Sequence, residues 1–216
     1  MSSPAVEDRT SRAIIRDESL RLFAERGPDA VTVREVAAAA GVSAALVIRH
    51  YGSKQGLQVA VDDHVVSTLE RVLGELADPA SGSPFDPASS SGIIDAVFGQ
   101  LPAGSSLPRY LGRMLLAGGP AAASVFRRLY EAARGVLDTL VQQGLASPGA
   151  DPSVRAAFLL TNDLAVFLLR DRIAEVIGTD PLSRQGMLRW AGELTQIYGE
   201  GLRSGGTAGD GAGHHE

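Results

Sequence analysis

Arginine, histidine and lysine gather in one short stretch of this chain, where their side chains could hold phosphate oxygens. The segment GVSAALVIRHYGSK, residues 41–54, carries Arg49, His50 and Lys54, and Lys54 is the only lysine among 216 residues. From residue 36 to residue 61, Arg49 and Lys54 are the only charged side chains, so no carboxylate there would repel a phosphate surface. This pattern predicts contact with a nucleic-acid backbone. The alternatives are an ordinary solvated arginine and a histidine bonded to a carbonyl at a helix end.

Lys54 has an unusual position as well as an unusual residue type. We predict that it begins a helix, where a cation opposes the helix dipole at a cost of about 0.3–1 kcal/mol. A phosphate docked at that helix end would be favoured by both the dipole and the lysine. The position of Lys54 therefore supports a phosphate contact.

Catalytic and metal-binding patterns do not accompany this segment. The chain has no cysteine, which excludes a disulfide, a thiolate metal site and a cysteine nucleophile. Its histidines are His50, His64, His214 and His215, and they lack the spacing of a zinc-binding helix. The small-residue segment GGPAAAS is not a nucleophile elbow, because no predicted strand precedes it. We expect no enzymatic activity, no cofactor and no metal.

Composition and charge limit the class of protein further. Hydrophobic residues make up 44% of the chain and charged residues 21%, values typical of a soluble globular protein. The net charge of −5 argues against a protein that coats nucleic acid non-specifically, but a local cationic face remains compatible with it. No apolar run approaches the roughly 20 residues of a membrane span, and the polar N-terminus is not a secretory signal. We expect a cytoplasmic protein without membrane contact.

Apolar residues recur at helical spacing almost throughout, which predicts an all-α fold. The first helix should run from about residue 10 to residue 26, after a loose tail at 1–8. The segment GPD at 27–29 ends this helix, because glycine suits the left-handed cap and proline cannot continue it. One face of the helix should be buried; its members are Ile15, Ser19, Leu22 and Phe23.

Two short capped helices should follow, forming a helix-turn-helix at 32–51. Thr32 and Glu35 have the spacing of a capping box at the start of the second helix. Gly41 permits the tight turn, Ser43 caps a third helix at about 44–51, and Ser53 caps a fourth at about 54–77. Val42 and Val47 should pack inward. A short outer face of small and apolar side chains suits a major groove; it consists of Ala44, Ala45, Ile48 and Arg49.

Residues 9–69 resemble the DNA-binding domain of TetR-type transcriptional regulators. The segments LRLFAERG, VTVREVAAAAGVS and RHYGSKQGL carry this resemblance. It implies that Thr32 contacts a phosphate near the start of the second helix, in addition to capping it. His50 and Lys54 would hold the DNA backbone, and Tyr51 would pack under the recognition helix, where the family usually has phenylalanine. The residues implied to face the groove are Ser43, Ala44, Ala45 and Arg49.

Two positions depart from the family pattern. The family often has glycine at the position of Ala45, and at the position of Ile48 a tyrosine that reaches a phosphate. Ile48 cannot make that polar contact and could instead touch a thymine methyl group. The sequence of the DNA site therefore cannot be carried over from the family.

The rest of the chain should form a helical regulatory and dimerisation domain. Residues 78–92 are rich in proline, serine and glycine and are predicted to be a linker loop. Residues 93–203 make up the second domain, with helices expected at about 93–100, 107–118, 120–145, 152–177 and 183–203. The C-terminal tail, 204–216, has a composition typical of disorder.

The helix expected at 152–177 is apolar on nearly every side, so it should be buried in a core or an interface. Helix-turn-helix proteins usually pair, since two half-sites about 34 Å apart need two recognition helices. We therefore predict a homodimer that pairs through 152–177 and about 186–202 as a four-helix bundle, and the resemblance implies the same pairing. Trp190 and Tyr198 could share that face, and monomer core is the alternative.

A small-molecule pocket is predicted in the same domain. Asn162 and Asp163 are polar residues within an apolar helix and need partners. These could be Arg170 or Arg172, the partner subunit, or a ligand in an apolar pocket with a few polar groups. The apolar residues that could line such a pocket, unless they form plain core, are Met114, Leu115, Phe126, Tyr130, Leu137, Phe158 and Phe167.

Together these features predict a homodimeric regulator, most simply a repressor, that binds a palindromic double-stranded DNA operator and is released by a small apolar ligand. One alternative is a DNA-binding regulator with a solid core and no small-molecule ligand. Another is a helical binding protein with a vestigial DNA-binding motif. A pocket of several hundred Å³ would separate the first reading from the second, and loss of salt-dependent DNA binding would support the third.

Overall fold

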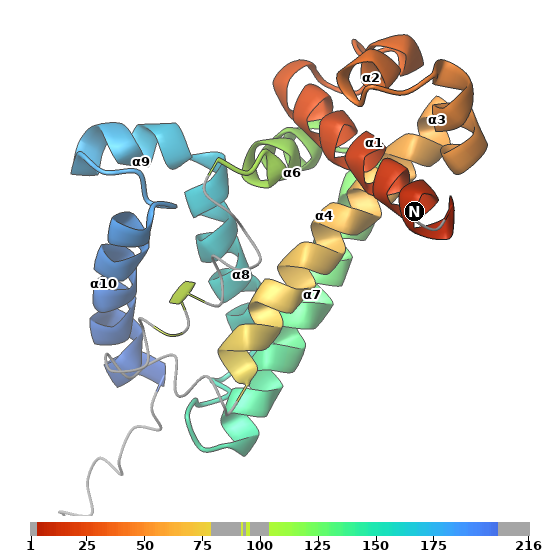
Figure 1. Ribbon diagram of the computed structural model, residues 1–216. Helices are drawn as coiled ribbons and strands as arrows, with labels where there is room; N and C mark the ends of the chain where they lie inside the picture. Colours follow the sequence, from red (N-terminus) through yellow and green to blue (C-terminus); the bar gives the residue numbers. More distant parts are fainter. Residues whose placement is uncertain (1–3, 79–91, 93, 96–103, 203–216) are drawn as a thin grey trace, which may run out of the picture.

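The computed structural model describes residues 4–78, 92, 94–95 and 104–202, and within these ranges the regular structure is entirely helical (Figure 1). The all-α prediction is confirmed. Four helices form the N-terminal part: α1 (Pro4–Arg26), α2 (Val33–Ala39), α3 (Ala44–Tyr51) and α4 (Lys54–Ala77). Five more helices are described in the rest of the chain: α6 (Leu107–Ala117), α7 (Gly119–Gln142), α8 (Pro152–Leu168), α9 (Arg170–Ile177) and α10 (Arg184–Leu202).

The first helix begins earlier than the sequence pattern predicted. It starts at Pro4 rather than near residue 10, so the loose tail expected at residues 1–8 is wrong from Pro4 onward. Proline is tolerated in the first turn of a helix, where its missing N–H would have no intrahelical partner. No glycine or further proline interrupts the chain before the turn at Gly27, which has a positive φ of 83°.

Side-chain caps set the starts of α2, α3 and α4 at the predicted cap residues. Thr32, Ser43 and Ser53 are the N-caps of these three helices, and each side chain accepts a hydrogen bond from a backbone N–H three residues on. Gly41, in the turn between α2 and α3, has a φ of 66°, a conformation that costs glycine little. Local polar contacts therefore fix the helix-turn-helix.

A continuous hydrophobic core joins the N-terminal helices to the remainder of the chain. The predicted inner face of α1 is confirmed, since Ile15, Ser19, Leu22 and Phe23 are all buried. The same cluster includes Val47 of α3 together with residues of α4, α6, α7 and α8. α4 runs alongside α7, and α6 lies against α1 (Figure 1). The long α4 thus connects the two parts of the molecule.

Tyr110 of α6 lies where three helices meet. Its ring is buried with its centroid 6.3 Å from that of Phe23 in α1. Its hydroxyl donates to a carboxylate oxygen of Asp62 in α4 at 2.5 Å. Three residues on, the Arg113 guanidinium donates to the carbonyl of Glu25 near the end of α1 at 3.2 Å. α6 is therefore fixed to both α1 and α4.

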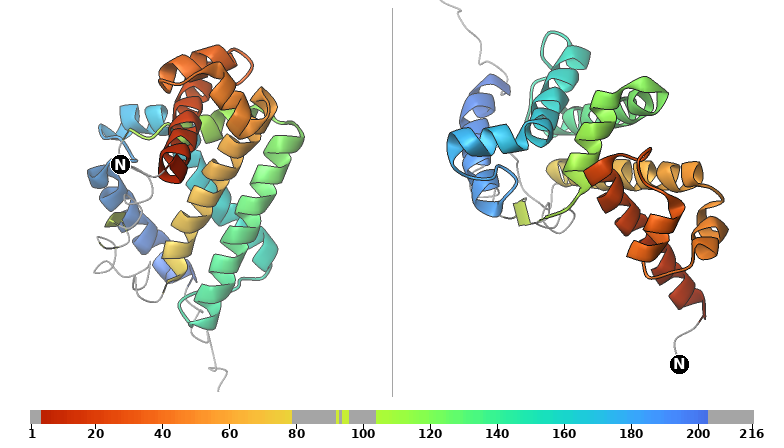
Figure 2. Two further views of the ribbon diagram at one scale, coloured as in Figure 1. Left: turned by 45° about the vertical axis from the view of Figure 1, so that its right-hand side comes forward. Right: turned by 90° about the horizontal axis from the view of Figure 1, so that it is seen from above.

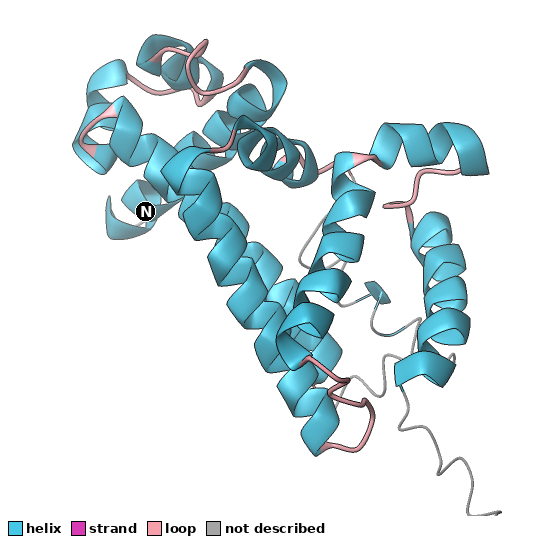
Figure 3. Ribbon diagram, turned by 180° about the vertical axis from the view of Figure 1, so that it is seen from behind, coloured by secondary structure: helices cyan, strands magenta, loops and turns pink. Residues whose placement is uncertain are grey.

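The single helix predicted at 152–177 is wrong, because the structure breaks it into α8 and α9, which are bent by 77° relative to each other (Figure 3). Leu169 sits at the break with φ −106° and ψ 13°. Directly after it, Arg170 forms an ion pair with Asp180, whose carboxylate also accepts from the backbone N–H of Leu182. This contact ties α9 to the loop before α10 directly after the change of direction.

The predicted burial of this region on all sides is also not seen in the single chain. One side of α8 faces the core through Ala156, Leu160 and Leu164. On other sides of α8 and α9 the apolar side chains Val154, Phe158, Leu168, Leu169 and Val176 are exposed.

Several predicted features lie outside the described residues. These are most of the linker at 78–92, most of the helix at 93–100 and the tail at 204–216, together with the side chain of Tyr198. Trp190 is half-buried. No single helix among the described residues is long and apolar enough to cross a membrane, and α8 with α9 reaches that length and composition only as the bent pair.

Candidate nucleic-acid interface

The recognition helix α3 presents a short outer face. Val47 is fully buried and anchors the helix, and Ala44 is half-buried against the core, closer to the inside than predicted. Ala45 and Arg49 are exposed, and Ile48 is 41% exposed. Ser43 precedes the helix, and its hydroxyl oxygen accepts from the N–H of Leu46 at 3.1 Å. A small, mostly apolar ridge with one guanidinium at its C-terminal end is what a major groove can accept.

Thr32 is the N-cap of α2, and its hydrogen bonds are already engaged. The hydroxyl oxygen accepts from the N–H of Glu35 at 3.2 Å, and the hydroxyl donates to the Glu35 carboxylate at 2.8 Å. The Thr32 N–H also donates to this carboxylate at 2.7 Å, and Arg26 forms an ion pair with it. A phosphate contact by the Thr32 hydroxyl would therefore require it to exchange its partner.

The same contacts lower the pKa of Glu35 to about 2. The backbone N–H of Thr32 is the largest cause, followed by the Thr32 hydroxyl and then the Arg26 guanidinium. All three favour the ionised carboxylate, because they donate hydrogen bonds to it or carry the opposite charge. The start of α2 therefore depends on a charged Glu35.

Lys54 links the start of α4 to the loop between α1 and α2. Its ammonium donates to the carbonyl of Asp29 at 3.2 Å, and the neighbouring Ser53 hydroxyl oxygen accepts from the N–H of Gly56. An ammonium has three N–H donors, so two remain for other acceptors. The contact with Asp29 spans 25 residues and could not be found from the local pattern.

Tyr51 is the last residue of the recognition helix α3, and its side chain contacts α1. Its hydroxyl donates to the carbonyl of Arg12 at 2.6 Å, and the Arg12 guanidinium lies 5.3 Å from the centre of its ring. Burial raises the pKa of the Tyr51 hydroxyl. His50 is half-buried, with its ring edge-on to Tyr51 at 6.3 Å. Arg12 is a contributor that sequence reasoning missed, because it lies 39 residues away from Tyr51.

α2, α3 and the start of α4 lie together at one end of the molecule (Figure 2). This brings the recognition helix and the two flanking helix starts to a single surface. The residues predicted for this surface therefore lie on adjacent elements; they are Thr32, Ser43, Ala44, Ala45, Ile48, Arg49, His50 and Lys54. Within the described residues no group of histidine, aspartate and glutamate side chains could hold a metal ion.

The residues predicted to line a ligand pocket lie on α6, α7 and α8. Four of them are half-buried and pack against the core: Met114, Leu115, Tyr130 and Phe167. Leu137 is buried. Phe126 and Phe158 are exposed in the single chain, and Asn162 and Asp163 are half-buried. These helices surround the interior of the second domain.

Asp163 does not find the arginine partners that were among its predicted alternatives. Arg170 pairs with Asp180, and Arg172 pairs with Glu175. Within the described residues no hydrogen bond or ion pair reaches the Asp163 carboxylate, and burial raises its pKa to about 7. The bond to Arg170 or Arg172 is therefore wrong, and a ligand or the partner subunit remains as its predicted contact.

The chain matches two family descriptions over the two parts of the fold. Residues 15–61 match "Bacterial regulatory proteins, tetR family", and residues 105–203 match "Tetracyclin repressor-like, C-terminal domain". The first range contains the helix-turn-helix, and the second contains α6 to α10.

Individual relatives agree with these matches. The HTH-type transcriptional regulatory protein RaaS of Mycobacterium tuberculosis is 32% identical over 200 residues, which cover 90% of this chain and 88% of that protein. Two solved structures share the fold. GusR of Salmonella enterica has a TM-score of 0.63 at 15% identity, covering 94% of this chain and 98% of its own.

The second structure is SmeT, the repressor of the SmeDEF multidrug efflux pump of Stenotrophomonas maltophilia. It has a TM-score of 0.59 at 22% identity and covers 87% of this chain and 89% of its own. At these identities the two structures establish the fold alone, whereas the family matches and the longer sequence relationship identify the family. The chain belongs to the tetR family of bacterial regulatory proteins and is a DNA-binding transcriptional regulator.

Proposed function

We propose that this regulator is a homodimeric repressor that binds a palindromic operator and leaves it when a small apolar ligand binds. The observation that carries the proposal is the recognition helix, whose outer face is free of carboxylates and lies beside the starts of α2 and α4. A regulator with this arrangement would act on DNA in the cytoplasm.

Each residue of the interface has a proposed role. Ser43, Ala44, Ala45 and Arg49 would face the base edges, although the half-buried Ala44 can offer only its outer side. Ile48 would meet a thymine methyl group, which is the apolar group that the major groove presents. The residues proposed to hold phosphates are Thr32, His50 and Lys54.

The dimer would form through α8 and α10. α10 follows α9 in the chain and does not pack closely on α4, α7 or α8 (Figure 1). Apolar side chains are exposed on both helices, including Val154 at 64% and Ile197 at 62%. A partner subunit that covered these side chains would remove their apolar surface from water. Two copies related by a two-fold axis would bury these faces and place two recognition helices on one side.

The ligand would enter between α6, α7 and α8 and would use Asn162 and Asp163 as polar contacts. The apolar walls would come from Met114, Leu115, Phe126, Tyr130, Phe158 and Phe167. Because Tyr110 and Arg113 fix α6 to α1 and α4, a ligand that displaces α6 would move the DNA-binding helices. Such a ligand can shift the equilibrium only by its differential affinity, typically about 1–3 kcal/mol.

A second candidate is a regulator with the same DNA site and no small-molecule ligand. The packing of Met114, Leu115, Tyr130 and Phe167 against the core favours it, because side chains that fill a core leave no room for a ligand. The two candidates have the same DNA-binding residues and differ only in what releases the protein from DNA.

Selection from a random duplex library tests the proposal. The purified protein should enrich a palindrome, and its affinity for that palindrome should fall steeply as salt rises, because bound phosphates release counterions. Absence of enrichment from a folded, dimeric preparation would contradict the DNA-binding role. A separate experiment distinguishes the ligand-released repressor from the regulator without a ligand. Thermal unfolding is measured with a panel of apolar compounds, since a ligand that binds the folded state raises its stability.

Arg49→Ala identifies the part that this residue plays in recognition. If Arg49 reads a base, its loss should cost about 1–3 kcal/mol and relax the preference at one position of the enriched palindrome. A uniform loss across all sequences would instead place Arg49 on the backbone. Both outcomes are read from the same library experiment, repeated with the variant.

A further inference from the structure

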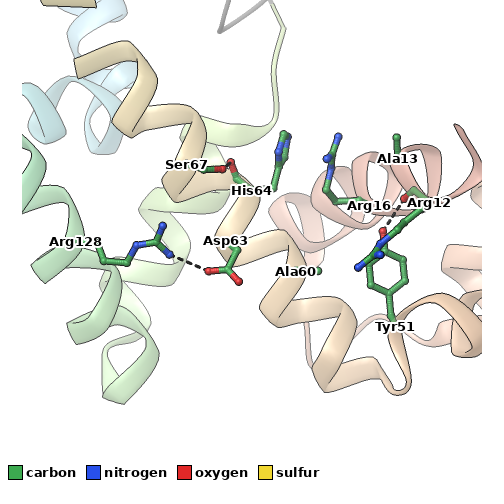
Figure 4. A pocket seen from close by; sticks show the side chains of 9 residues that line it. All are labelled: Arg12, Ala13, Arg16, Tyr51, Ala60, Asp63, His64, Ser67 and Arg128. Atoms are coloured by element: carbon green, nitrogen blue, oxygen red, sulfur yellow. Dashed lines mark hydrogen bonds and ion pairs between the residues drawn. The ribbon is translucent and has the colours of Figure 1, made fainter. Parts of the chain in front are cut away.

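A groove of about 460 Å³ runs along α4 at the junction of the two parts of the chain (Figure 4). Its floor is one face of α4, where successive turns bring Ala60, His64 and Ser67 into line. α1 forms one wall and α7 contributes to the other, and Tyr51 closes one end. The full lining is Arg12, Ala13, Arg16, Tyr51, Ala60, Asp63, His64, Ser67 and Arg128. None of these residues belongs to the ligand pocket proposed above.

The lining contains three guanidinium groups and one carboxylate. Arg128 is largely engaged, because its guanidinium bonds to both Asp63 and Glu70. Arg16 bonds to Asp17 through Nε and Nη2. A guanidinium has five N–H donors, so three of those on Arg16 remain for another acceptor.

Arg12 is the least engaged of the three. Its guanidinium lies over the Tyr51 ring and opposes the rise in the pKa of the Tyr51 hydroxyl, and within the described residues it forms no ion pair. The ring fixes the position of the cation and leaves its N–H groups for another acceptor. A positioned guanidinium with unused donors is suited to a carboxylate or a phosphate, because its planar donors match their paired oxygens.

His64 adds a donor that depends on pH. Figure 4 shows its ring and the Arg16 side chain pointing the same way from neighbouring helices. Burial lowers the pKa of His64, and the charges of Arg16 and Arg71 lower it further, while Asp17 opposes them. The carboxylates Asp63 and Glu70 and the Arg128 guanidinium complete the charged groups around the groove. Ser67 donates its hydroxyl to the carbonyl of His64, so the donors available to an anion come from the arginines and His64.

We propose that this groove binds a small anion carrying two or more phosphate or carboxylate groups, held by Arg12, Arg16 and His64. The volume lies within the usual range for a small-molecule site, about 300–1,000 Å³. The anion would supply acceptors for N–H groups of Arg12. Its negative charge would also offset the positive charges of Arg16 and Arg71, which disfavour protonated His64. The proposal does not depend on the operator or on the apolar ligand.

Calorimetric titration of the full-length protein without DNA tests the proposal, with inorganic pyrophosphate and citrate as separate probes at constant ionic strength. Saturable binding of one anion per chain is expected, and the two probes distinguish phosphate from carboxylate. Arg12→Gln and Arg16→Gln should each weaken binding about tenfold, because each removes charge-assisted hydrogen bonds. Arg12→Gln breaks no ion pair and loses only the contact with the Tyr51 ring, so the melting temperature should fall slightly.

Arg127→Gln is the matched control, because Arg127 is an exposed neighbour of Arg128 that does not line the groove. It removes the same charge and should leave the anion affinity unchanged. Lowering the pH from 8 to 6 should strengthen binding more in the wild type than in His64→Gln, since the bound anion favours protonated His64. Absence of saturable binding at millimolar anion, or equal weakening by Arg127→Gln and Arg12→Gln, would overturn the proposal.

Discussion

Lys54 combines a contact within the fold with a proposed contact to DNA. Its ammonium is anchored to the carbonyl of Asp29, which places a cation at the start of α4 beside the recognition helix. A cation there opposes the helix dipole, and the carbonyl oxygen offsets part of that cost.

Lys54→Ala should weaken DNA binding for all sequences and flatten the dependence on salt by about one unit of slope, because one phosphate contact is lost. The measurement is operator affinity across a salt series. The variant also loses the bond to Asp29, so its unfolding free energy should be compared with the wild type first. A folded variant with the wild-type slope would remove Lys54 from the phosphate contacts.

Tyr51→Phe should destabilise the protein by about 1 kcal/mol, because it leaves the Arg12 carbonyl without the 2.6 Å hydrogen bond while keeping the ring beneath the guanidinium. Equilibrium denaturation measures this difference. Tyr130→Phe is the comparison, since the Tyr130 hydroxyl makes only a long bond of 3.4 Å to the Ser153 carbonyl and an exposed contact with Arg134, so its loss should cost less. If both variants lost the same free energy of unfolding, the hydrogen bond of the Tyr51 hydroxyl would contribute no more than that of Tyr130.

At the scale of the element, the start of α2 depends on the charge of Glu35. Its pKa falls from an ordinary 4.5 to about 2 in the folded protein. A lowered folded pKa means that the contribution to stability is present above pH 4.5 and is lost as the pH falls toward 2. Glu35→Gln should therefore reduce stability at pH 7 and make stability less sensitive to pH between 4.5 and 2.

Denaturation of the wild type and Glu35→Gln at pH 7 and pH 3 measures this effect. Glu131→Gln is the matched control, because Glu131 is exposed on α7 and its carboxylate makes no hydrogen bond or ion pair within the described part of the chain. It should follow the wild type at both pH values. If Glu35→Gln and the wild type lost stability equally on acidification, the capping box would not be responsible.

The elements also show which parts of the fold the sequence could predict. The N-caps of α2, α3 and α4 can be predicted to the residue, because Thr32, Ser43 and Ser53 act on N–H groups three residues away. The break at Leu169 was missed, since it accompanies an ion pair between Arg170 and Asp180 across a loop. Local patterns reveal caps and periodicity, whereas contacts between distant residues decide where a long apolar segment bends.

In the candidate interface, too, local patterns could be predicted from the sequence, whereas contacts between distant residues could not. The residues of α3 could be assigned to inner and outer faces from helical spacing, and only Ala44 lies further inside than expected. The anchoring of Lys54 by Asp29 and the support of Tyr51 by Arg12 depend on residues 25 and 39 positions away. Nothing in the neighbouring sequence marks these partners.

At the scale of the whole molecule, the exposed apolar faces of α8 and α10 lead to a prediction about assembly. Val154→Glu and Ile197→Glu should each shift the protein from dimer to monomer, because a carboxylate buried in an apolar interface without a partner is costly. Sedimentation equilibrium measures the shift, and operator affinity should fall with it.

Val59→Glu is the control for this experiment. Val59 lies on α4 and is 58% exposed, close to the 62% of Ile197, so the substitution adds the same charge to a similarly exposed site on another helix. It should leave the association state unchanged. Dimers that persist in both Val154→Glu and Ile197→Glu would exclude α8 and α10 as the interface.

The position of Tyr110 has a consequence for building hybrid regulators. Its ring packs on Phe23 and its hydroxyl bonds to Asp62, so α6 is part of the same packed unit as the DNA-reading helices. A graft that transferred only residues 4–77 to another body would leave Phe23 uncovered and Asp62 without its donor. The smallest transferable module is therefore discontinuous in sequence and must include the Tyr110 face of α6.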